Sequence, residues 1–277
     1  MNYLKIESLK KAKRKGFYDV ITSEGKYLLS ENIIVQYTII NGAEFEKNEF
    51  DKIIKKNEDE KIINSVYSYI AFKMRSENEI KDYLVNKNAS NLLIEKCIRD
   101  LKNLGYINDN ELAKAVMNYT INNHKGPKAL EMKLKERGID NKIVDATCKL
   151  YDDDKENEVI SLIIDSIISK YQKYPIKKQK QKIQEKLLRD GFSSNIVFNQ
   201  VSKLNLVFCN DDELEKDILK VVKTLQNYKY KDCKDYEIKN KFINKMLSKG
   251  YSYNDISKYI DKYIEVIIES FDKDYLD

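Results

Sequence analysis

The chain has 277 residues, of which 42% are hydrophobic and 34% charged, and its 50 basic and 45 acidic residues give a formal net charge of +5. So small an excess does not attract a polyanion unless the charges gather in one place. No apolar run approaches the roughly 20 residues that span a bilayer, and the start, MNYLKIESLKKAKRK, lacks the apolar core of a signal peptide. We therefore expect a cytoplasmic protein with no membrane partner.

The first 56 residues differ from the rest. The segment 17–30, FYDVITSEGKYLLS, alternates apolar and polar residues around Ser23-Glu24-Gly25-Lys26, which predicts a β-hairpin. The segment 32–40, NIIVQYTII, fits a strand or a helix. A helix over Glu44–Lys56 is expected to connect this part to the rest of the chain. We predict a small β-rich module with a linking helix over residues 1–56.

A helix–turn–helix pattern then recurs along the chain. YLVNKNASNLLI (83–94) aligns with KLKERGIDNKIV (133–144), KLLRDGFSSNIV (186–197) and KMLSKGYSYNDI (245–256). Each copy has an apolar anchor four residues before a turn residue that tolerates the left-handed conformation, and a helix N-cap two residues after it. The turn residues are Asn88, Gly138, Gly191 and Gly250, and the caps are Ser90, Asp140, Ser193 and Ser252.

The turns are 50, 53 and 59 residues apart, which leaves room for a third helix in each copy. Three short amphipathic helices cannot bury their apolar faces alone, so neighbouring units must stack. The predicted fold is mainly α: tandem three-helix repeats in an elongated curved array, with the small β-rich module before them. The predicted repeats cover 57–107, 108–154, 155–208 and 209–277, the last with an acidic end.

Residues that carry chemistry are scarce. Four cysteines lie far apart and the single histidine, His124, adjoins a turn, so a zinc site is not expected. No phosphate-binding loop, dinucleotide-binding fingerprint, HExxH or GxSxG motif is present. The acidic clusters 152–154 and 211–212 stand at predicted helix starts, where they favour the helix dipole. We predict a protein without enzymatic activity, metal or cofactor.

Basic residues gather in two segments. One is 10–15; the other is 173–189, with seven basic residues and one acid. Arg75, Lys125 and Lys178 occupy one position in three repeats, nine residues before the anchor, where the fourth repeat has Glu237. A row of cations suits phosphates or acidic protein surfaces. The alternative is that these are ordinary solvated faces of lysine-rich helices.

Residues 74–140 resemble the RecX family of recombination regulators. The resemblance rests on Arg75-Ser76-Glu77, on Gly105-Tyr106-Ile107-Asn108-Asp109 followed by Leu112-Ala113, and on Lys125-Gly126-Pro127 with Leu134 and Gly138-Ile139. These features keep the family's order and spacing, and the match extends over 60–204. The sequence departs from the family at Asn88, where glycine is common, and at Leu112, where phenylalanine is common.

The resemblance implies a monomeric protein without a cofactor that binds the RecA recombinase filament on DNA. It would limit filament growth and damp strand exchange and coprotease activity, with DNA, single-stranded or within the filament, bound only weakly by the protein alone. The candidate filament-binding residues are Arg75, Lys125, Lys128, Lys177, Lys178 and Lys182. Two other interpretations stay open: a helical-repeat module that binds DNA with no obligate protein partner, and a purely structural scaffold.

Overall fold

The computed structural model describes residues 3–208, 210–227, 230 and 233–273. The chain divides into two compact units. The first unit contains residues 1–113 with 135–143, and the second contains 114–134 with 144–277.

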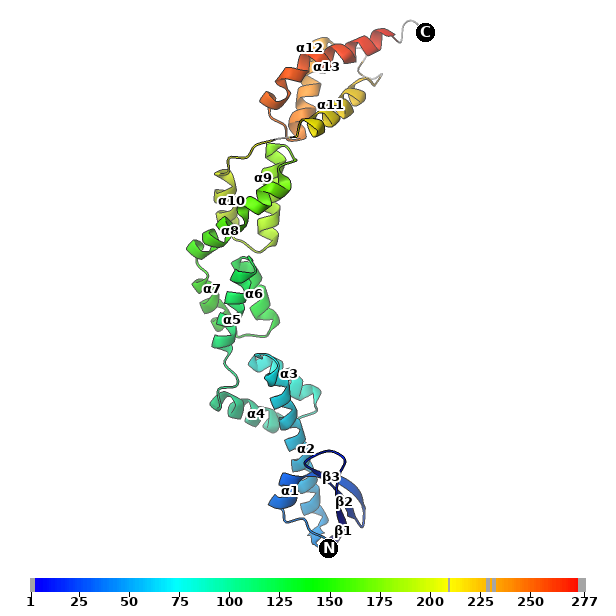
Figure 1. Ribbon diagram of the computed structural model, residues 1–277, viewed down its shortest axis with the longest axis vertical. Coiled ribbons are helices and arrows are strands. Elements are labelled where there is room, and N and C mark those ends of the chain that lie inside the picture. Colours follow the sequence, from blue (N-terminus) through cyan, green and yellow to red (C-terminus); the bar gives the residue numbers. More distant parts are fainter. Residues whose placement is uncertain (1–2, 209, 228–229, 231–232, 274–277) are drawn as a thin grey trace. The chain divides into compact units, whose positions relative to one another are not determined.

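A four-stranded antiparallel sheet with one short helix forms the amino-terminal module (Figure 1). The sheet order is β3-β2-β1-β4. The predicted hairpin is confirmed, because β2 pairs with β3 and Thr22 lies opposite Gly25. The segment of ambiguous pattern forms helix α1, capped by the Ser30 side chain, which accepts from the Ile33 N–H. The elements are β1 (Tyr3–Lys11), β2 (Phe17–Thr22), β3 (Gly25–Ser30), α1 (Glu31–Gln36) and β4 (Glu44–Glu46).

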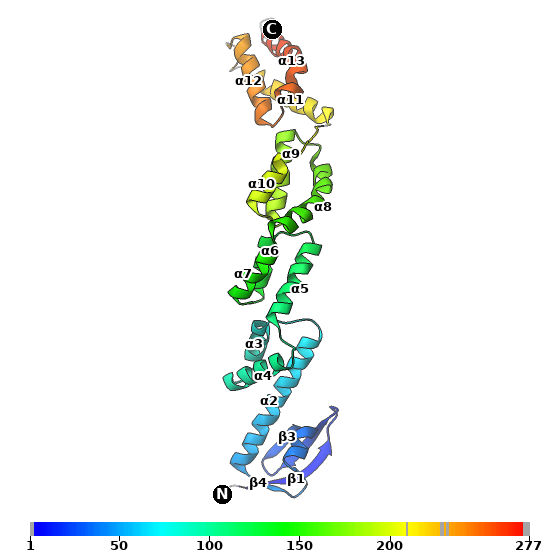
Figure 2. The same ribbon diagram turned by 90° about the vertical axis from the view of Figure 1, so that its left-hand side faces the viewer.

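Helix α2 (Lys47–Ala71) belongs to two hydrophobic cores at once. Its first half packs Phe50 and Ile53 against the sheet, beside which it lies in Figure 2. Its second half places Val66 in the core of the first repeat. The helix begins three residues after the predicted start, because Glu44–Glu46 pairs with β1 as a strand, and it runs well past Lys56. The predicted boundary at residue 56 therefore lies inside a continuous helix.

A buried amide fixes this helix to the sheet. The side chain of Asn57 is buried, accepts a hydrogen bond from the Ser30 N–H at 2.9 Å and donates one to the Leu28 carbonyl at 3.0 Å. Both main-chain groups lie at the end of the edge strand β3, so the Asn57 side chain of α2 provides them with hydrogen-bond partners.

With the second half of α2 as the first helix of the first set, the remaining described helices form sets of three, which confirms the predicted mainly helical repeat fold (Figure 1). In each set the second and third helices are joined by the predicted tight turn. The third repeat begins two residues earlier than predicted, with the Asp152 side chain capping its first helix. The helices are α3 (Glu77–Asn86) and α4 (Asn91–Asn103); α5 (Asp109–Asn122), α6 (Pro127–Glu136) and α7 (Asn141–Leu150); α8 (Asp153–Tyr171), α9 (Ile176–Arg189) and α10 (Ser194–Ser202); and α11 (Asp211–Leu225), α12 (Asp235–Ser248) and α13 (Tyr253–Lys273).

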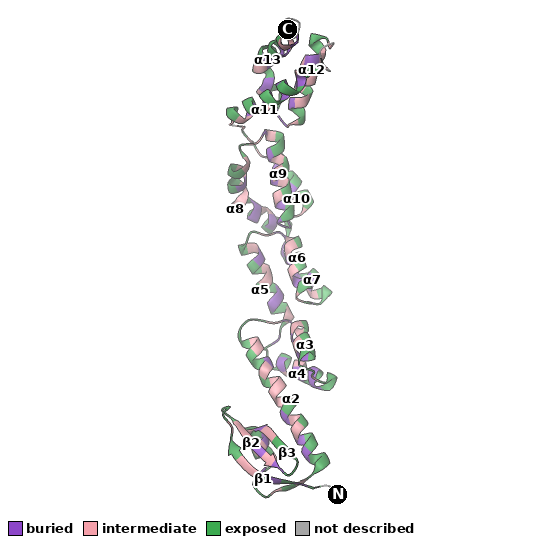
Figure 3. Ribbon diagram, turned by 90° about the vertical axis from the view of Figure 1, so that its right-hand side faces the viewer, coloured by how far each residue is buried: buried purple, intermediate pink, exposed green. Residues whose placement is uncertain are grey.

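The aligned apolar positions form the cores of the repeats. The four anchors, Leu84, Leu134, Leu187 and Met246, are all fully buried. The residues one helical turn before them are fully buried as well: Ile80, Leu130, Ile183 and Phe242. Figure 3 colours buried residues purple and exposed residues green, and both colours recur along the helices of the repeats. The spacing of apolar residues thus decides which face of each middle helix is buried.

Within the second unit, the turn before α10 packs against the start of α6. The Gly126 N–H donates to the Asp190 carbonyl at 2.9 Å, and the Lys128 N–H donates to the Gly191 carbonyl at 3.0 Å. A Cβ atom at Gly126 would lie closer than 3.0 Å to backbone atoms of Gly191 and Phe192. Gly126 is therefore required by this close approach of two backbones, not by its own conformation.

We predict that Gly126→Ala lowers the free energy of unfolding by about 1–3 kcal/mol, because the added methyl group forces the two segments apart. Urea unfolding followed by circular dichroism measures the change. Without the contact, alanine at this position would instead stabilise the chain by about 0.4–1 kcal/mol. An unchanged or higher stability would therefore rule the contact out.

The matched control is Gly105→Ala. Gly105 has φ +75° and no neighbouring atom within 4 Å of an added Cβ. That variant reports only the cost of a left-handed alanine, about 1 kcal/mol, and no steric overlap.

Candidate functional site

The position that carries the aligned cations is followed by a buried residue in every repeat. The residue directly after it is buried in all four copies: Ser76, Gly126, Gln179 and Ile238. The helix start differs, however. Arg75 and Lys125 precede their helices, whereas Lys178 and Glu237 lie in the first turns of α9 and α12, which start earlier relative to the turn. An alignment of the repeats by distance from the turn residue therefore matches buried positions correctly. It does not match positions of the same backbone conformation.

Arg75 is engaged inside the first unit. Its side chain is only 15% exposed, and its guanidinium lies 3.6 Å from Glu79 and 3.7 Å from the centroid of the Tyr69 ring. Arg137, from the turn after α6, donates to the same Glu79 carboxylate at 2.7 Å. Burial alone would raise the pKa of Glu79, but the Ser76 N–H and Arg137 outweigh it and hold that pKa below its usual value.

Ser76 completes this junction. Its hydroxyl accepts from the Glu79 N–H at 3.0 Å and donates to the Arg137 carbonyl at 2.6 Å. The Glu79 side chain returns a hydrogen bond by accepting from the Ser76 N–H. The capping box at the start of α3 thus also forms a hydrogen bond to the turn that ends at Gly138.

Lys125 is engaged in the second unit in a parallel way. Its ammonium lies 2.7 Å from an oxygen of Asp190, and Lys186 pairs with the other oxygen. The Asp190 side chain is 7% exposed. Burial alone would raise its pKa, but the hydrogen bonds from Lys125 and Lys186 prevail, and the pKa of Asp190 lies below its usual value. Arg75 and Lys125 therefore act first as contacts between a helix start and a turn.

The lysines of α9 are arranged differently. Lys177 and Lys178 are exposed and Lys182 half-buried, and among the described residues none of them has an acidic group within ion-pair distance. Lys178 and Lys182, one turn apart, lie 5.4 and 4.7 Å from the centroid of the Tyr174 ring. Such rings hold the ammonium groups without neutralising them.

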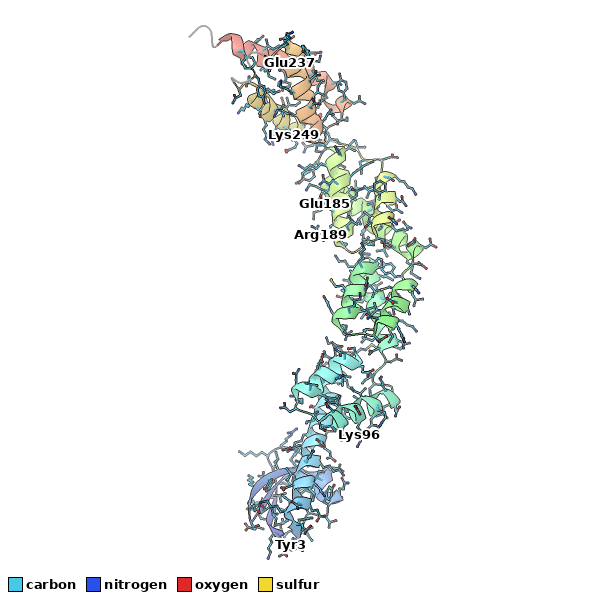
Figure 4. All side chains as sticks on the ribbon, turned by 180° about the vertical axis from the view of Figure 1, so that it is seen from behind. Tyr3, Lys96, Glu185, Arg189, Glu237 and Lys249 are labelled. Carbon is cyan, nitrogen blue, oxygen red and sulfur yellow. The ribbon has the colours of Figure 1, made fainter. Side chains whose placement is uncertain are left out.

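The rest of the helix has one acid on this surface. Glu185 accepts from the Gln181 amide at 2.8 Å, and Arg189 lies one turn further on, as labelled in Figure 4. Lys128, on the exposed side of α6, is also without an ion-pair partner among the described residues. We call Lys177, Lys178 and Lys182 the α9 lysines.

The four turn residues all have a left-handed backbone. Asn88, Gly138, Gly191 and Gly250 have φ values of 57°, 66°, 92° and 100°. The side chains of Ser90, Asp140 and Ser252 accept backbone N–H groups two or three residues ahead, at 3.3, 2.9 and 3.2 Å. Ser193 stands at the N-cap without a side-chain cap bond, and its own N–H donates to the buried carboxylate of Glu156.

Groups able to hold a metal do not converge in the described part of the chain. His124 is exposed in a turn, with φ 52°. The cluster 152–154 begins α8, where Asp152 caps the helix and Lys155 lies 3.5 Å away. Cys97 is buried and Cys209 lies outside the described residues. No described helix is long and apolar enough to cross a membrane.

Two residues in these contacts between a helix start and a turn are not among the residues predicted from the sequence. Arg137 and Asp190 both directly precede a turn glycine, and each contacts the start of the preceding repeat's middle helix. Their aligned position was a usable signal, but their charges are opposite. Only the pairing across repeats explains both, and that pairing is a tertiary contact.

Comparison with known proteins adds a consistent result, although no family model matches the chain. The chain is 29% identical over 264 residues to regulatory protein RecX of Streptococcus agalactiae serotype V. This alignment covers 94% of the chain and all of the relative. It is 24% identical over 260 residues to regulatory protein RecX of Limosilactobacillus reuteri, covering 93% and 97%. The RecX protein of Bacillus velezensis is 26% identical over 258 residues, covering 92% and 97%.

Solved structures agree with this fold. The crystal structure of a regulatory protein RecX superposes with a TM-score of 0.57 at 22% identity, covering 73% of this chain and 100% of that one. The structure of RecX from Lactobacillus salivarius gives 0.51 at 26% identity, covering 55% and 99%.

The depressed pKa of Asp190 predicts how its contribution depends on pH. A carboxyl whose pKa is lower in the folded chain than in the unfolded chain stabilises the fold above the unfolded value, near 4, and loses that effect as the pH falls through the folded value. We predict that Asp190→Asn lowers the urea midpoint at neutral pH and reduces the loss of stability on acidification to about pH 3.

Asp261→Asn is the control, because Asp261 is 82% exposed and its pair with Lys239 is a surface contact. Equal effects of the two substitutions at neutral pH would show that Lys125 and Lys186 do not stabilise Asp190.

Proposed function

Because this chain belongs to the RecX family of regulatory proteins, we propose that it binds the RecA recombinase filament on DNA and limits recombination, strand exchange and coprotease activity. The family likeness over the full length of the relatives is the observation that carries the proposal. In this role the protein is a cytoplasmic monomer that acts by binding, without catalysis or a cofactor.

The repeat architecture suits such a target. Tandem repeats offer many modest contacts to a partner, and a filament repeats its own surface at a regular interval. Affinity then arises from the number of contacts rather than from a deep pocket. The α9 lysines and Lys128 supply cations that are not neutralised within the described structure, and they suit the phosphates of filament DNA or acidic patches on its subunits.

The six candidate residues have two roles in this proposal. Arg75 and Lys125 hold helix starts to turns, so they keep the repeats in place and contact the filament only through their remaining exposed atoms. Lys128 and the α9 lysines contact the filament directly. Removing charge from the two sets should therefore have different effects.

We predict that changing Lys177, Lys178 and Lys182 together to alanine leaves circular dichroism and melting temperature unchanged and weakens binding to RecA-coated single-stranded DNA. The logarithmic salt slope of binding should fall by about 2–3, roughly one unit for each lost phosphate contact. Inhibition of strand exchange should require more protein. Fluorescence anisotropy across a salt series and a strand-exchange assay measure the two effects.

The matched control removes three exposed lysines of α4 and α7, Lys96, Lys142 and Lys149. Both variants lose the same net charge. Equal weakening by both would show a general charge effect and remove the α9 lysines from the interface.

Arg75→Ala and Lys125→Ala are predicted to lower the melting temperature, because they leave the half-buried Glu79 and the buried Asp190 with fewer partners. A pair of variants with wild-type melting but lost filament binding would reverse the two roles.

The second candidate function is DNA binding without an obligate protein partner. Binding of the whole protein to bare and to RecA-coated DNA, compared across salt concentrations, decides between them. A preference for RecA-coated DNA supports regulation through RecA, and equal binding supports the DNA-binding module.

A further inference from the structure

A second basic region belongs to the first unit. The turn between β1 and β2 and the strand end before it contain five cations that are all exposed. None of them forms an ion pair among the described residues. The five are Lys10, Lys11, Lys13, Arg14 and Lys15.

This cationic turn borders a groove in the first unit. The groove has a volume of about 430 Å³ and lies between Arg14, the second half of α2 and Tyr83 of α3. Its lining consists of two cations, three aromatic rings and three small polar residues, with no acid among them. Such a lining suits a ligand that is anionic and has flat groups to stack.

One ring in the groove is free to stack. Phe72, at the end of α2, is 88% exposed and makes no ring contact among the described residues. Tyr69 is already enclosed, because Tyr83 stacks on it at 4.3 Å and Arg75 lies 3.7 Å from its centroid, which requires opposite faces. The Tyr69–Tyr83 pair therefore forms a rigid floor beside the exposed Phe72.

The cations next to the groove keep their charge available. Arg14 lies 4.2 Å from the centroid of the Phe17 ring, which orients the guanidinium without neutralising it. Lys61 is occupied, since it donates to the Leu28 carbonyl at 2.9 Å. The Glu60 carboxylate accepts hydrogen bonds from the side chains of Ser30 and Asn32. The unpaired charge thus comes from the β1–β2 turn.

We propose that this groove binds single-stranded nucleic acid, with a base stacked on Phe72 and the adjoining phosphates held by the β1–β2 turn. A duplex keeps its bases stacked inside, so only an unpaired base can use an exposed ring. The row of adjacent cations matches a chain of phosphates better than a single anion. The site does not depend on RecA.

The first test measures binding of the whole protein to a fluorescein-labelled oligothymidylate by anisotropy. Phe72→Ala is expected to weaken binding roughly fivefold or more, whereas Phe72→Tyr, which keeps a ring, should stay within about twofold of the wild type. Phe198→Ala, which removes a 65%-exposed ring of α10, is the control and should not change the affinity. Phe72→Ala with wild-type affinity would overturn the proposal.

The second test concerns the cations. Changing Lys13 and Arg14 together to alanine should lower the salt slope for the single strand by about 1.4, since each lost contact lowers it by about 0.7. Changing Lys96 and Lys142 together should leave it as it is. Preferential binding of a duplex of the same length, or an unchanged slope, would contradict the proposal.

An oligouridylate of the same length distinguishes RNA from DNA as the strand preferred, and either preference supports the groove. Because no RecA is present in these assays, their outcome is separate from that of the proposed regulation. Normal inhibition of RecA by Phe72→Ala, combined with lost oligonucleotide binding, would support both proposals as independent sites.

Discussion

The contact between the start of one repeat's middle helix and the turn of the next repeat is the constraint on which the helical part depends. In the second unit it brings two backbones together at Gly126 and Gly191, with hydrogen bonds of 2.9 and 3.0 Å. In the first unit the Ser76 hydroxyl and the Arg137 carbonyl make the equivalent contact. A three-helix unit has too little core to be stable alone, and the otherwise unpaired groups at helix ends need partners.

Charge in this chain has two uses that sequence does not separate. Arg75 and Lys125 pair within the fold with Glu79, which is half-buried, and Asp190, which is buried. Of the α9 lysines, Lys178 and Lys182 lie over the Tyr174 ring, and none of the three has an ion-pair partner among the described residues, so their charge stays available to another molecule. The basic residues that hold the repeats together are therefore different from those that are available to bind another molecule.

Helix α2 connects the amino-terminal module to the first repeat. One continuous helix carries Phe50 and Ile53 into the core of the module and Val66 into that of the repeat. The module is thus fixed to the repeat by helix stiffness and not by a linker. The same helix ends at Phe72, so the exposed ring and the cationic β1–β2 turn border one groove.

The amino-acid pattern alone predicts the helical repeat, its turns and the buried anchors, because those depend on local conformation and on a periodicity that each unit repeats. Leu84, Leu134, Leu187 and Met246 are buried as their spacing predicted. It also determined the β2–β3 hairpin, whose turn is local. The resemblance to the RecX family, made on motifs of 74–140, agreed with relatives matched over nearly the whole chain.

The folded structure is needed to show which cations are paired. Asp190 stands 65 residues from Lys125 and Arg137 stands 58 from Glu79, and no local pattern links them. It also decided that 32–36 is helical and that α2 continues past residue 56, since a short apolar segment fits either conformation until its neighbours are known. Electrostatic pairing and the packing of a helix against two cores join residues far apart in the sequence. The periodicity of apolar residues therefore does not predict them.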